Sequence, residues 1–292
     1  MISSNKYFST DFDYSEYLNG DTVRRLLDNL PPISALEEDS GSSSGHSLHW
    51  RSFYNSHSKG LVYKPRKYLY SEFKPFFDSA FLDGDRETAV TVLEVGCGYG
   101  CSVVPLARLL HENGIKDVFL IASDYCEESL SILRGADHYE EYGAYLRTLR
   151  WDATAPFDTD LLPVPCPRPS LVLCVFTLSA VSPDNHLAVL RNVAALLLPG
   201  GCLLLRDYAF ADLTMFRHKS RVGKMLFLRG QEKTLAYYFT PEYLESLVDA
   251  LQGLLVVEEM QVCTVRLRNR AGSKDSADMP RCFVHCVLRK GK

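Results

Sequence analysis

The sequence of 292 residues lacks the features of several protein classes. It has no apolar run long enough to cross a membrane, and its start, MISSNKYFST, has neither the basic residues nor the apolar core of a signal peptide. Its nine cysteines form no CxxC pair and show no metal-ligand spacing, so we expect reduced thiols, an intracellular protein and no bound metal. The net charge of −4 is not that of a typical nucleic-acid-binding protein, so binding of nucleic acid would depend on local basic clusters.

The chain is organised around a β-branched, apolar run that stops in a glycine-rich turn, TVLEVGCGYG over residues 91–100. Gly96, Gly98 and Gly100 allow positive φ angles and let a ligand approach the backbone closely. The next segment, SVVPLARLL, has the pattern of a helix whose N-terminus would face that ligand. The stretch therefore predicts a strand, a turn and a helix around a nucleotide-type ligand.

The spacing of the glycines indicates which ligand this is. A dinucleotide fingerprint would place a glycine where Cys101 stands, whereas the observed pattern is E-x-G-x-G-x-G, beginning at Glu94. The next apolar run, DVFLIASD, ends in Asp124, which is placed to accept hydrogen bonds from a ribose diol. This arrangement resembles that of the class I S-adenosylmethionine (SAM) methyltransferases. An ordinary tight turn, with Asp124 as a helix N-cap, is the alternative.

Apolar strand patterns alternate with helical patterns along the rest of the chain. The expected strands cover 91–95, 118–123, 146–150, 171–176, 202–208, 254–268 and 281–289. Such alternation predicts a mainly parallel sheet with helices on both faces. Together with the glycine motif, it indicates the Rossmann-like class I methyltransferase fold with a seven-stranded sheet.

Polar residues follow two of these strands at the sheet edge where such folds bind ligands. Asp152 follows the third strand and is placed to bond an adenine amino group, although a capping or surface role is equally open. Arg206, Asp207 and Tyr208 emerge from the fifth strand and are the candidate catalytic residues. The alternative interpretation is that these three side chains are only exposed to solvent at the end of the strand.

Basic residues are concentrated in two loops. The insertion over 209–239 carries Arg217, Lys219, Arg229 and further lysines and arginines, and a second set follows the strand at 254–268: Arg266, Arg268, Arg270 and Lys274. A basic run is usually a solvated face, but two such sets on loops favour a nucleic-acid partner. Before the first strand, Trp50 and Tyr54 share one helix face, either as a lid over the ligand or as part of a helix docked on the sheet.

Several stretches together resemble the tRNA N3-methylcytidine methyltransferases: HWRSFY, LEVGCGYG, ASD, FTLSAVSP, LLRDYAFADLTMFR, KMLFLRG, YYFT and PRCFV. The resemblance runs from about residue 48 to the C-terminus and implies SAM as cofactor and tRNA as substrate. It implies SAM contacts at Trp50, Tyr54, Gly96, Asp124, Asp152 and the backbone around Val175. It implies tRNA contacts at Arg66, Arg217, Lys219, Arg229 and Arg281. Pro65 and Lys67 stand where the family usually has an acid and a histidine.

The same resemblance sets the expected domains. We assign 1–47 to an N-terminal extension and flexible linker, and 48–292 to the methyltransferase domain. Within that domain, 48–90 is expected to be a lid or RNA-contacting segment and 209–239 a basic insertion.

The expected reaction is methyl transfer to N3 of an unpaired cytidine in the anticodon-loop region. N3 has a free lone pair, so no strong base is needed, but the product is cationic. A carboxylate beside the base would stabilise that charge, and Asp207 is the candidate, with Tyr208 or Arg206 fixing the base. A SAM enzyme acting on a protein or small molecule, and a non-catalytic subunit, are the alternatives. We expect a monomer that acts in the cytoplasm, and location in the nucleus or an organelle is the alternative. An aminoacyl-tRNA synthetase or another tRNA-binding protein is the expected helper.

Overall fold

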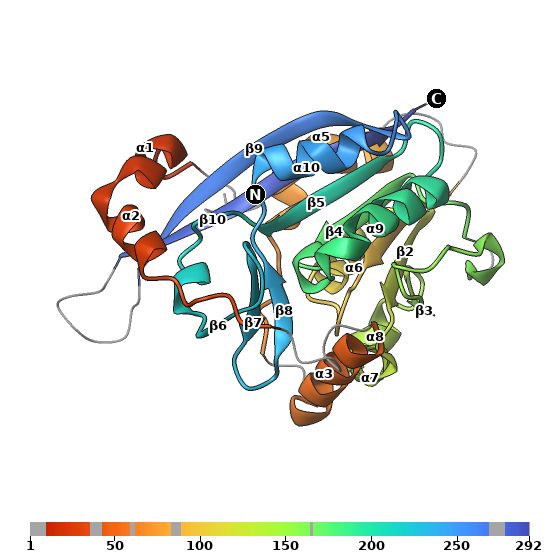
Figure 1. Cartoon of the computed structure of the whole chain (residues 1–292). Helices are drawn as coiled ribbons and strands as arrows, with labels where there is room; N and C mark the ends of the chain where they lie inside the picture. Colours follow the sequence, from red (N-terminus) through yellow and green to blue (C-terminus); the bar gives the residue numbers. More distant parts are fainter. Residues whose placement is uncertain are drawn as a thin grey trace.

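A computed structural model describes residues 10–35, 43–58, 62–82, 89–163, 166–268 and 278–291. At its centre is a seven-stranded sheet in the order β3-β2-β1-β4-β5-β10-β9 (Figure 1). The strands are β1 (Val90–Val95), β2 (Val118–Asp124), β3 (Leu146–Arg150), β4 (Leu171–Val175), β5 (Cys202–Tyr208), β9 (Leu255–Arg268) and β10 (Asp278–Lys290). The first five pair in parallel, and β10 runs antiparallel to both β5 and β9. The predicted fold class is confirmed.

Helices cover both faces of this sheet because alternate residues of each strand point to opposite sides. Leu93 on β1 belongs to a core with α9 (Pro183–Leu196) and α10 (Pro241–Asp249). Its neighbour Val92 belongs to the opposite core, with residues of α5 (Lys74–Leu82), α6 (Val103–Glu112) and α7 (Glu127–Arg134). The remaining short helices of this part are α4 (Leu69–Glu72) and α8 (Asp137–Glu141). Within the described ranges, no helix has both the length and the apolarity needed to span a membrane.

A buried ionic network joins α4 to the C-terminal half of the sheet. Arg206 Nη1 on β5 lies 2.5 Å from Glu72 Oε1, and both side chains are 0% exposed. His285 on β10 lies 3.0 Å from the same Glu72 oxygen and 3.0 Å from Glu259 Oε2 on β9. Burial lowers the pKa of His285, but hydrogen bonds to the two carboxylates outweigh it and raise that pKa. The network therefore fixes the segment that leads into the first core strand.

The insertion between β5 and α10 forms a small antiparallel sheet that the sequence analysis did not predict. Its strands are β6 (Ser220–Arg221), β7 (Leu226–Arg229) and β8 (Thr234–Tyr237). Short strands of two to four residues give too little alternation to be recognised from sequence.

Residues 10–35, here called the N-terminal arm, pack against this insertion. The arm contains α1 (Tyr14–Asn19) and α2 (Asp21–Asp28), and Val23 is 1% exposed. Ser34 N donates to Arg221 O at 2.9 Å, and α3 (Ser43–Ser56) begins inside the stretch expected to be a flexible linker. Residues 31–35 thus contact the insertion, far away in sequence, and the flexibility of 31–47 stays a prediction.

The buried network predicts a large stability effect for Arg206→Met. This change keeps most of the side-chain volume but removes the guanidinium partner of the buried Glu72 carboxylate and leaves only His285 beside it, so the free energy of unfolding should fall by about 3 kcal/mol. Urea denaturation followed by circular dichroism measures it. The matched control is Lys74→Met, which removes the cation of an exposed pair with Asp78 and should cost less than about 1 kcal/mol. Equal losses in the two variants would contradict the prediction.

Candidate functional site

A cavity of about 530 Å³ lies at the C-terminal ends of the parallel strands. This is within the size range of pockets for nucleotide-sized ligands. Loops after β1, β2, β3, β4 and β5 line it, and so do α3, residues 63–66 and β10. Its lining divides into two groups, here called the glycine half, around Gly96, Gly98 and Asp124, and the arginine half, around Arg66, Arg229 and Arg281.

Two glycines of the motif are required by their surroundings in the glycine half. Gly96 has φ +64° and Gly98 has φ +56°, as the sequence predicted. A Cβ atom on Gly96 would lie 2.3 Å from Thr177 Cγ2, and one on Gly98 would lie 2.7 Å from Tyr54 Oη. Gly100 also has a positive φ but does not line the cavity, because it turns the chain into α6. The turn thus brings bare backbone to the cavity surface.

Asp124 joins the end of β2 to this turn. Its Oδ2 accepts a hydrogen bond from Gly98 N at 2.8 Å, and its Oδ1 accepts one from Cys126 N at 2.9 Å. The residue is 5% exposed and lines the cavity, and burial raises its pKa to about 6. At pH 7 the group is a carboxylate whose remaining lone pairs are acceptors for a ligand's hydroxyl groups.

Glu94, the first residue of the motif from which we predicted the ligand site, does not line the cavity. It is fully buried beneath the turn, where Oε2 accepts from Val103 N at 3.1 Å at the start of α6. Burial raises its pKa to about 7, and Arg66 Nη1 lies 4.0 Å from its other oxygen. A carboxylate at a helix N-terminus is favourably placed, so Glu94 fastens the glycine turn to the helix.

The helix α3 covers the glycine half. Trp50 and Tyr54 line the cavity from the same helix face, with ring centroids 5.8 Å apart and planes inclined by 28°. Arg51 forms an ion pair with Glu128 on α7 and so ties α3 to the sheet domain. Helix α3 therefore combines the two interpretations offered for it, because it docks on the protein and also lies over the cavity.

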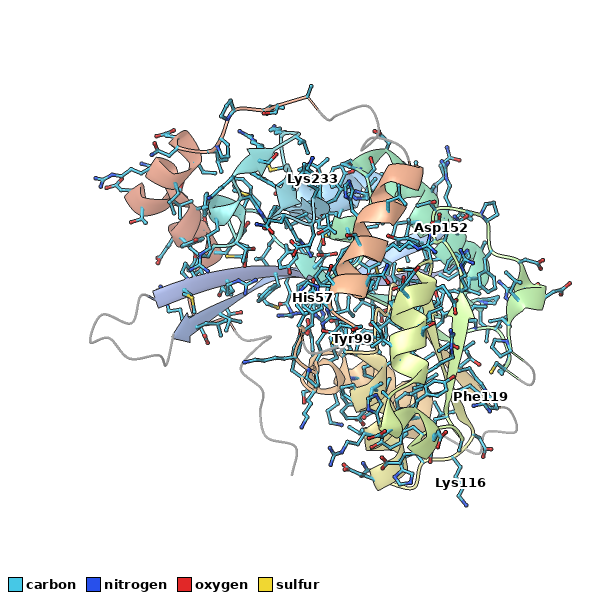
Figure 2. The ribbon with its side chains drawn as sticks, turned by 90° about the horizontal axis from the view of Figure 1, so that it is seen from below. His57, Tyr99, Lys116, Phe119, Asp152 and Lys233 are labelled. Atoms are coloured by element: carbon cyan, nitrogen blue, oxygen red, sulfur yellow. The ribbon has the colours of Figure 1, made fainter. Side chains whose placement is uncertain are left out.

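Asp152 lies at the cavity and also stabilises the turn after β3, and its bond to adenine stays a prediction. It lines the cavity after β3, while its Oδ1 accepts from the backbone N and the hydroxyl of Thr154, at 2.9 Å and 2.8 Å. In Figure 2, Asp152 lies beside α3 and Tyr99 below the lower end of that helix, and both line the cavity, whereas Lys116 lies at the bottom of the view.

The arginine half combines guanidinium groups with aromatic rings. Arg229 lies 5.3 Å from the ring centroid of Tyr208, and Arg281 lies 5.0 Å from that of Phe283. Arg66 lies 5.1 Å from the ring centroid of Phe176 and donates to Val175 O at 3.4 Å. These rings contact one another, since the ring centroid of Phe176 lies 4.8 Å from that of Tyr208 and 5.6 Å from that of Phe283.

Two details indicate that this half is prepared for a ligand. Arg229 Nη2 is buried and has no hydrogen-bond partner, which is costly for a charged group unless a ligand supplies an acceptor. Phe176 has φ +55°, a left-handed conformation that side chains other than glycine rarely adopt and that is often found at functional sites. Planar rings beside cations suit a flat heterocycle with acceptor atoms.

The five basic residues expected to contact RNA separate into two groups. Arg66, Arg229 and Arg281 line the cavity, whereas Arg217 and Lys219 are exposed on the insertion. The sequence could not distinguish these groups, because the difference depends on how segments far apart in the chain pack around the cavity. Of the second basic set, Arg270 and Lys274 lie outside the described residues.

Only one of the three candidate catalytic residues reaches the cavity. Tyr208 lines it, but Arg206 and Asp207 are 0% exposed and do not. Asp207 Oδ2 accepts from Ser179 N at 2.9 Å and Oδ1 from Tyr208 N at 2.8 Å, and burial raises its pKa to about 6. The expectation that Arg206 and Asp207 contact a base is corrected, because the Arg206 side chain is paired with the buried Glu72 and the Asp207 carboxylate with Ser179 N, away from the cavity surface.

The sequence analysis missed the aromatic residues Tyr63, Phe176 and Phe283 as cavity residues. Phe176 directly follows β4, at the sheet edge where ligands bind, and that position was an available signal. Phe283 lies inside β10 and gave none, because its place depends on how β10 pairs with β5.

Comparison with known proteins identifies the family. The methyltransferase domain family model matches residues 19–259. The tRNA N(3)-cytidine methyltransferase METTL6 of Rattus norvegicus is 31% identical, over 82% of this chain and 78% of its own length. The chain belongs to the tRNA N3-methylcytidine methyltransferase family. The tRNA N(3)-methylcytidine methyltransferase trm140 of Schizosaccharomyces pombe is 28% identical, over 83% of this chain and 74% of its own.

A solved structure supports the fold of this methyltransferase. A SAM-dependent methyltransferase from Anabaena variabilis superposes with a TM-score of 0.59 at 12% identity, over 89% of this chain and 99% of its own. Pro65, at the position where the resemblance led us to expect an acid, lines the cavity beside Arg66.

S-adenosylmethionine is the cofactor of this methyltransferase, and when bound it supplies a methyl group carried on a sulfonium. The glycine half fits it. Asp124 would accept hydrogen bonds from the ribose diol, and the bare backbone at Gly96 and Gly98 would lie against the methionine part. Trp50 and Tyr54 would cover the molecule with aromatic faces, which attract a cation.

The Asp124 carboxylate predicts a pH-dependent affinity for SAM. Because the pKa of Asp124 is raised to about 6, SAM affinity should fall as the pH drops through 6 and the carboxylate takes up a proton. Asp124→Ala should lower affinity about tenfold or more at pH 7.5 and remove that pH dependence. Calorimetric titration measures both, with the exposed Asp160→Ala as control. A variant that keeps wild-type affinity would refute this role.

Proposed function

We propose that this methyltransferase transfers the methyl group of SAM to N3 of an unpaired cytidine in the anticodon-loop region of tRNA. The observation that carries the proposal is the arginine half, where three guanidinium groups and a cluster of aromatic rings adjoin the SAM-binding glycine half. The names of the two relatives specify methylation of cytidine N3 in tRNA for those proteins.

The chemistry of cytosine explains why such a lining suits it. N3 lies on the pairing edge, so the nucleotide must leave any stack or pair before it can reach a cofactor inside a cavity. The base is flat and fits between rings, and its O2 is an acceptor for a guanidinium group. The buried Arg229 Nη2, without a partner, is our candidate donor. N3 needs no base to activate it, so orientation is the main contribution of the protein.

The last three residues of β5, Arg206, Asp207 and Tyr208, have separate roles in this proposal. Tyr208 contacts the base, because it alone of the three candidates lines the cavity. Asp207 positions Tyr208 by accepting from its backbone N, and its buried negative charge stabilises the cationic product from below the floor. Arg206 positions the neighbouring ring of Tyr68, whose centroid lies 5.1 Å from its guanidinium group.

Contacts with the body of the tRNA belong to the outer surface. Arg217 and Lys219 are exposed on the insertion and are our candidates for phosphate contacts. We further propose that the protein is a monomer that acts in the cytoplasm. A helper that binds tRNA, such as an aminoacyl-tRNA synthetase, contributes part of the tRNA selection.

The direct test is methyl transfer from labelled SAM to total tRNA, followed by mass spectrometry of the nucleosides. We expect 3-methylcytidine, and we expect none from Asp124→Ala as the cofactor-site control. Binding of tRNA should weaken steeply with salt, because phosphate contacts release counterions. SAM binding without any methylated nucleoside, in the presence and absence of a cell extract, would instead favour a different substrate or a non-catalytic role.

Two basic residues give a matched test of cavity against surface. Arg229→Met should lower turnover at saturating tRNA at least tenfold, because a charge-assisted hydrogen bond to the base is lost inside the cavity. Lys219→Met should leave turnover unchanged while it weakens tRNA binding and reduces the salt slope by about one. Steady-state kinetics and filter binding at several salt concentrations separate the effects. The reverse pattern would contradict the assignment.

A further inference from the structure

The turn that follows β5 has a conformation that needs support. Ala211 has φ +60°, in the left-handed region that is unfavourable for a residue with a Cβ atom. Tyr14 of the N-terminal arm donates its hydroxyl to Phe210 O at 2.8 Å, and Tyr17 donates to Ala211 O at 3.0 Å. Two successive carbonyl groups of this strained turn are therefore held by the arm, from about 195 residues away in sequence.

The next residue of the turn, Asp212, directs a cavity residue. Asp212 is 0% exposed. Its Oδ1 accepts from Thr214 N at 2.9 Å, and its Oδ2 accepts from Arg281 Nε at 2.8 Å and from Cys282 N at 2.9 Å. A buried carboxylate with donors from two segments has one favourable orientation, and so does the arginine bound to it.

Arg281 connects Asp212 to the cavity. Its Nε is bound to Asp212, and its guanidinium group lines the arginine half between Phe283 and Tyr208, at 5.0 Å and 6.0 Å from the ring centroids. Displacement of the 210–212 turn would move Asp212 and with it the guanidinium group. The 210–212 turn is therefore the connection between the arm and Arg281 to test.

The arm has further attachments that do not involve these two hydroxyl groups. Asp11 N donates to Thr264 O at 2.8 Å, and Arg266 N donates to Asp11 Oδ2 at 2.9 Å. Val23 is buried, and Leu27 packs against the core of the insertion. Figure 1 shows α1 and α2 beside the ends of β9 and β10, close to the small sheet. The arm should therefore stay docked when the hydroxyl groups alone are removed.

We propose that Tyr14 and Tyr17 are positioning residues for the methyl-transfer site. Their hydroxyl groups hold the 210–212 turn, the turn fixes Asp212, and Asp212 aims Arg281 at the acceptor base. The inference rests on the proposed function in one respect, since Arg281 is taken to contact the substrate. It assigns to the N-terminal arm a part in completing the cavity from outside the sheet.

The test is the double variant Tyr14→Phe/Tyr17→Phe, which keeps both rings and removes both hydroxyl groups. We expect kcat/KM for tRNA to fall about tenfold, in line with the loss of two buried hydrogen bonds, with SAM affinity unchanged. The matched control is Tyr70→Phe, which removes a hydroxyl group bonded to Asp78 outside the cavity and should change kcat/KM less than twofold. Wild-type kcat/KM in the double variant would overturn the proposal.

A double-mutant cycle with Arg281→Lys separates positioning from general loss of structure. If the hydroxyl groups act through Arg281, the double phenylalanine variant should cause less than a twofold further loss in the Arg281→Lys background. Multiplication of the two losses would overturn the proposed route, because independent sites are additive in free energy.

Hydrogen exchange of the free protein gives a readout that needs no substrate. Faster exchange of the amide of Cys282, which donates to Asp212, is expected in the double phenylalanine variant and not in Tyr70→Phe. Unchanged exchange there would overturn the positioning route, whatever the substrate is. Absence of 3-methylcytidine with the wild-type protein, together with faster exchange at Cys282, would refute only the proposed function.

Discussion

The hydrogen bond between the Asp124 carboxylate and Gly98 N is the constraint on which the glycine half depends. It holds the end of β2 against the turn after β1, so that bare backbone and a carboxylate face the same space. The turn can approach so closely because Gly98 has no Cβ atom, which would collide with Tyr54. The same contact sets the position of α3, because Tyr54 packs directly over the glycine.

Buried charges below the cavity floor determine where its lining points. Glu94 fastens the turn to α6, Asp207 holds the backbone of Tyr208, and Asp212 holds Arg281. Each carboxylate accepts backbone hydrogen bonds or faces a cation, as burial of a charge requires. The groups left on the cavity surface in this part are arginines and aromatic rings. The buried carboxylates fix the positions of the arginines and aromatic rings on the cavity surface. Such a fixed arrangement suits a reaction whose main requirement is orientation of the substrate.

Local patterns predicted the α/β core closely. The strands β3 and β5 were expected at 146–150 and 202–208, and the structure has both. Positive φ angles at Gly96 and Gly98, and the place of Asp124 at a strand end, also followed from sequence, because each depends on residues within one strand–turn–helix unit. By contrast, Arg206 and Asp207 were expected in the site on their strand-end position alone. That position does not decide which way a side chain turns.

The sequence by itself determined the fold class, the glycine turn and the aromatic face of α3, since these follow from hydrophobic period and from the conformations that glycine permits. Only the tertiary structure decided which charges are buried and which face the cavity. Glu72 meets Arg206 across 134 positions, and Tyr14 meets Phe210 across 196. Contacts over such separations arise when packing brings segments together, and no local pattern encodes the partner. The arginine half therefore depends on the pairing of β10 with β5, which places Phe283 opposite Tyr208 and brings Arg281 to the cavity.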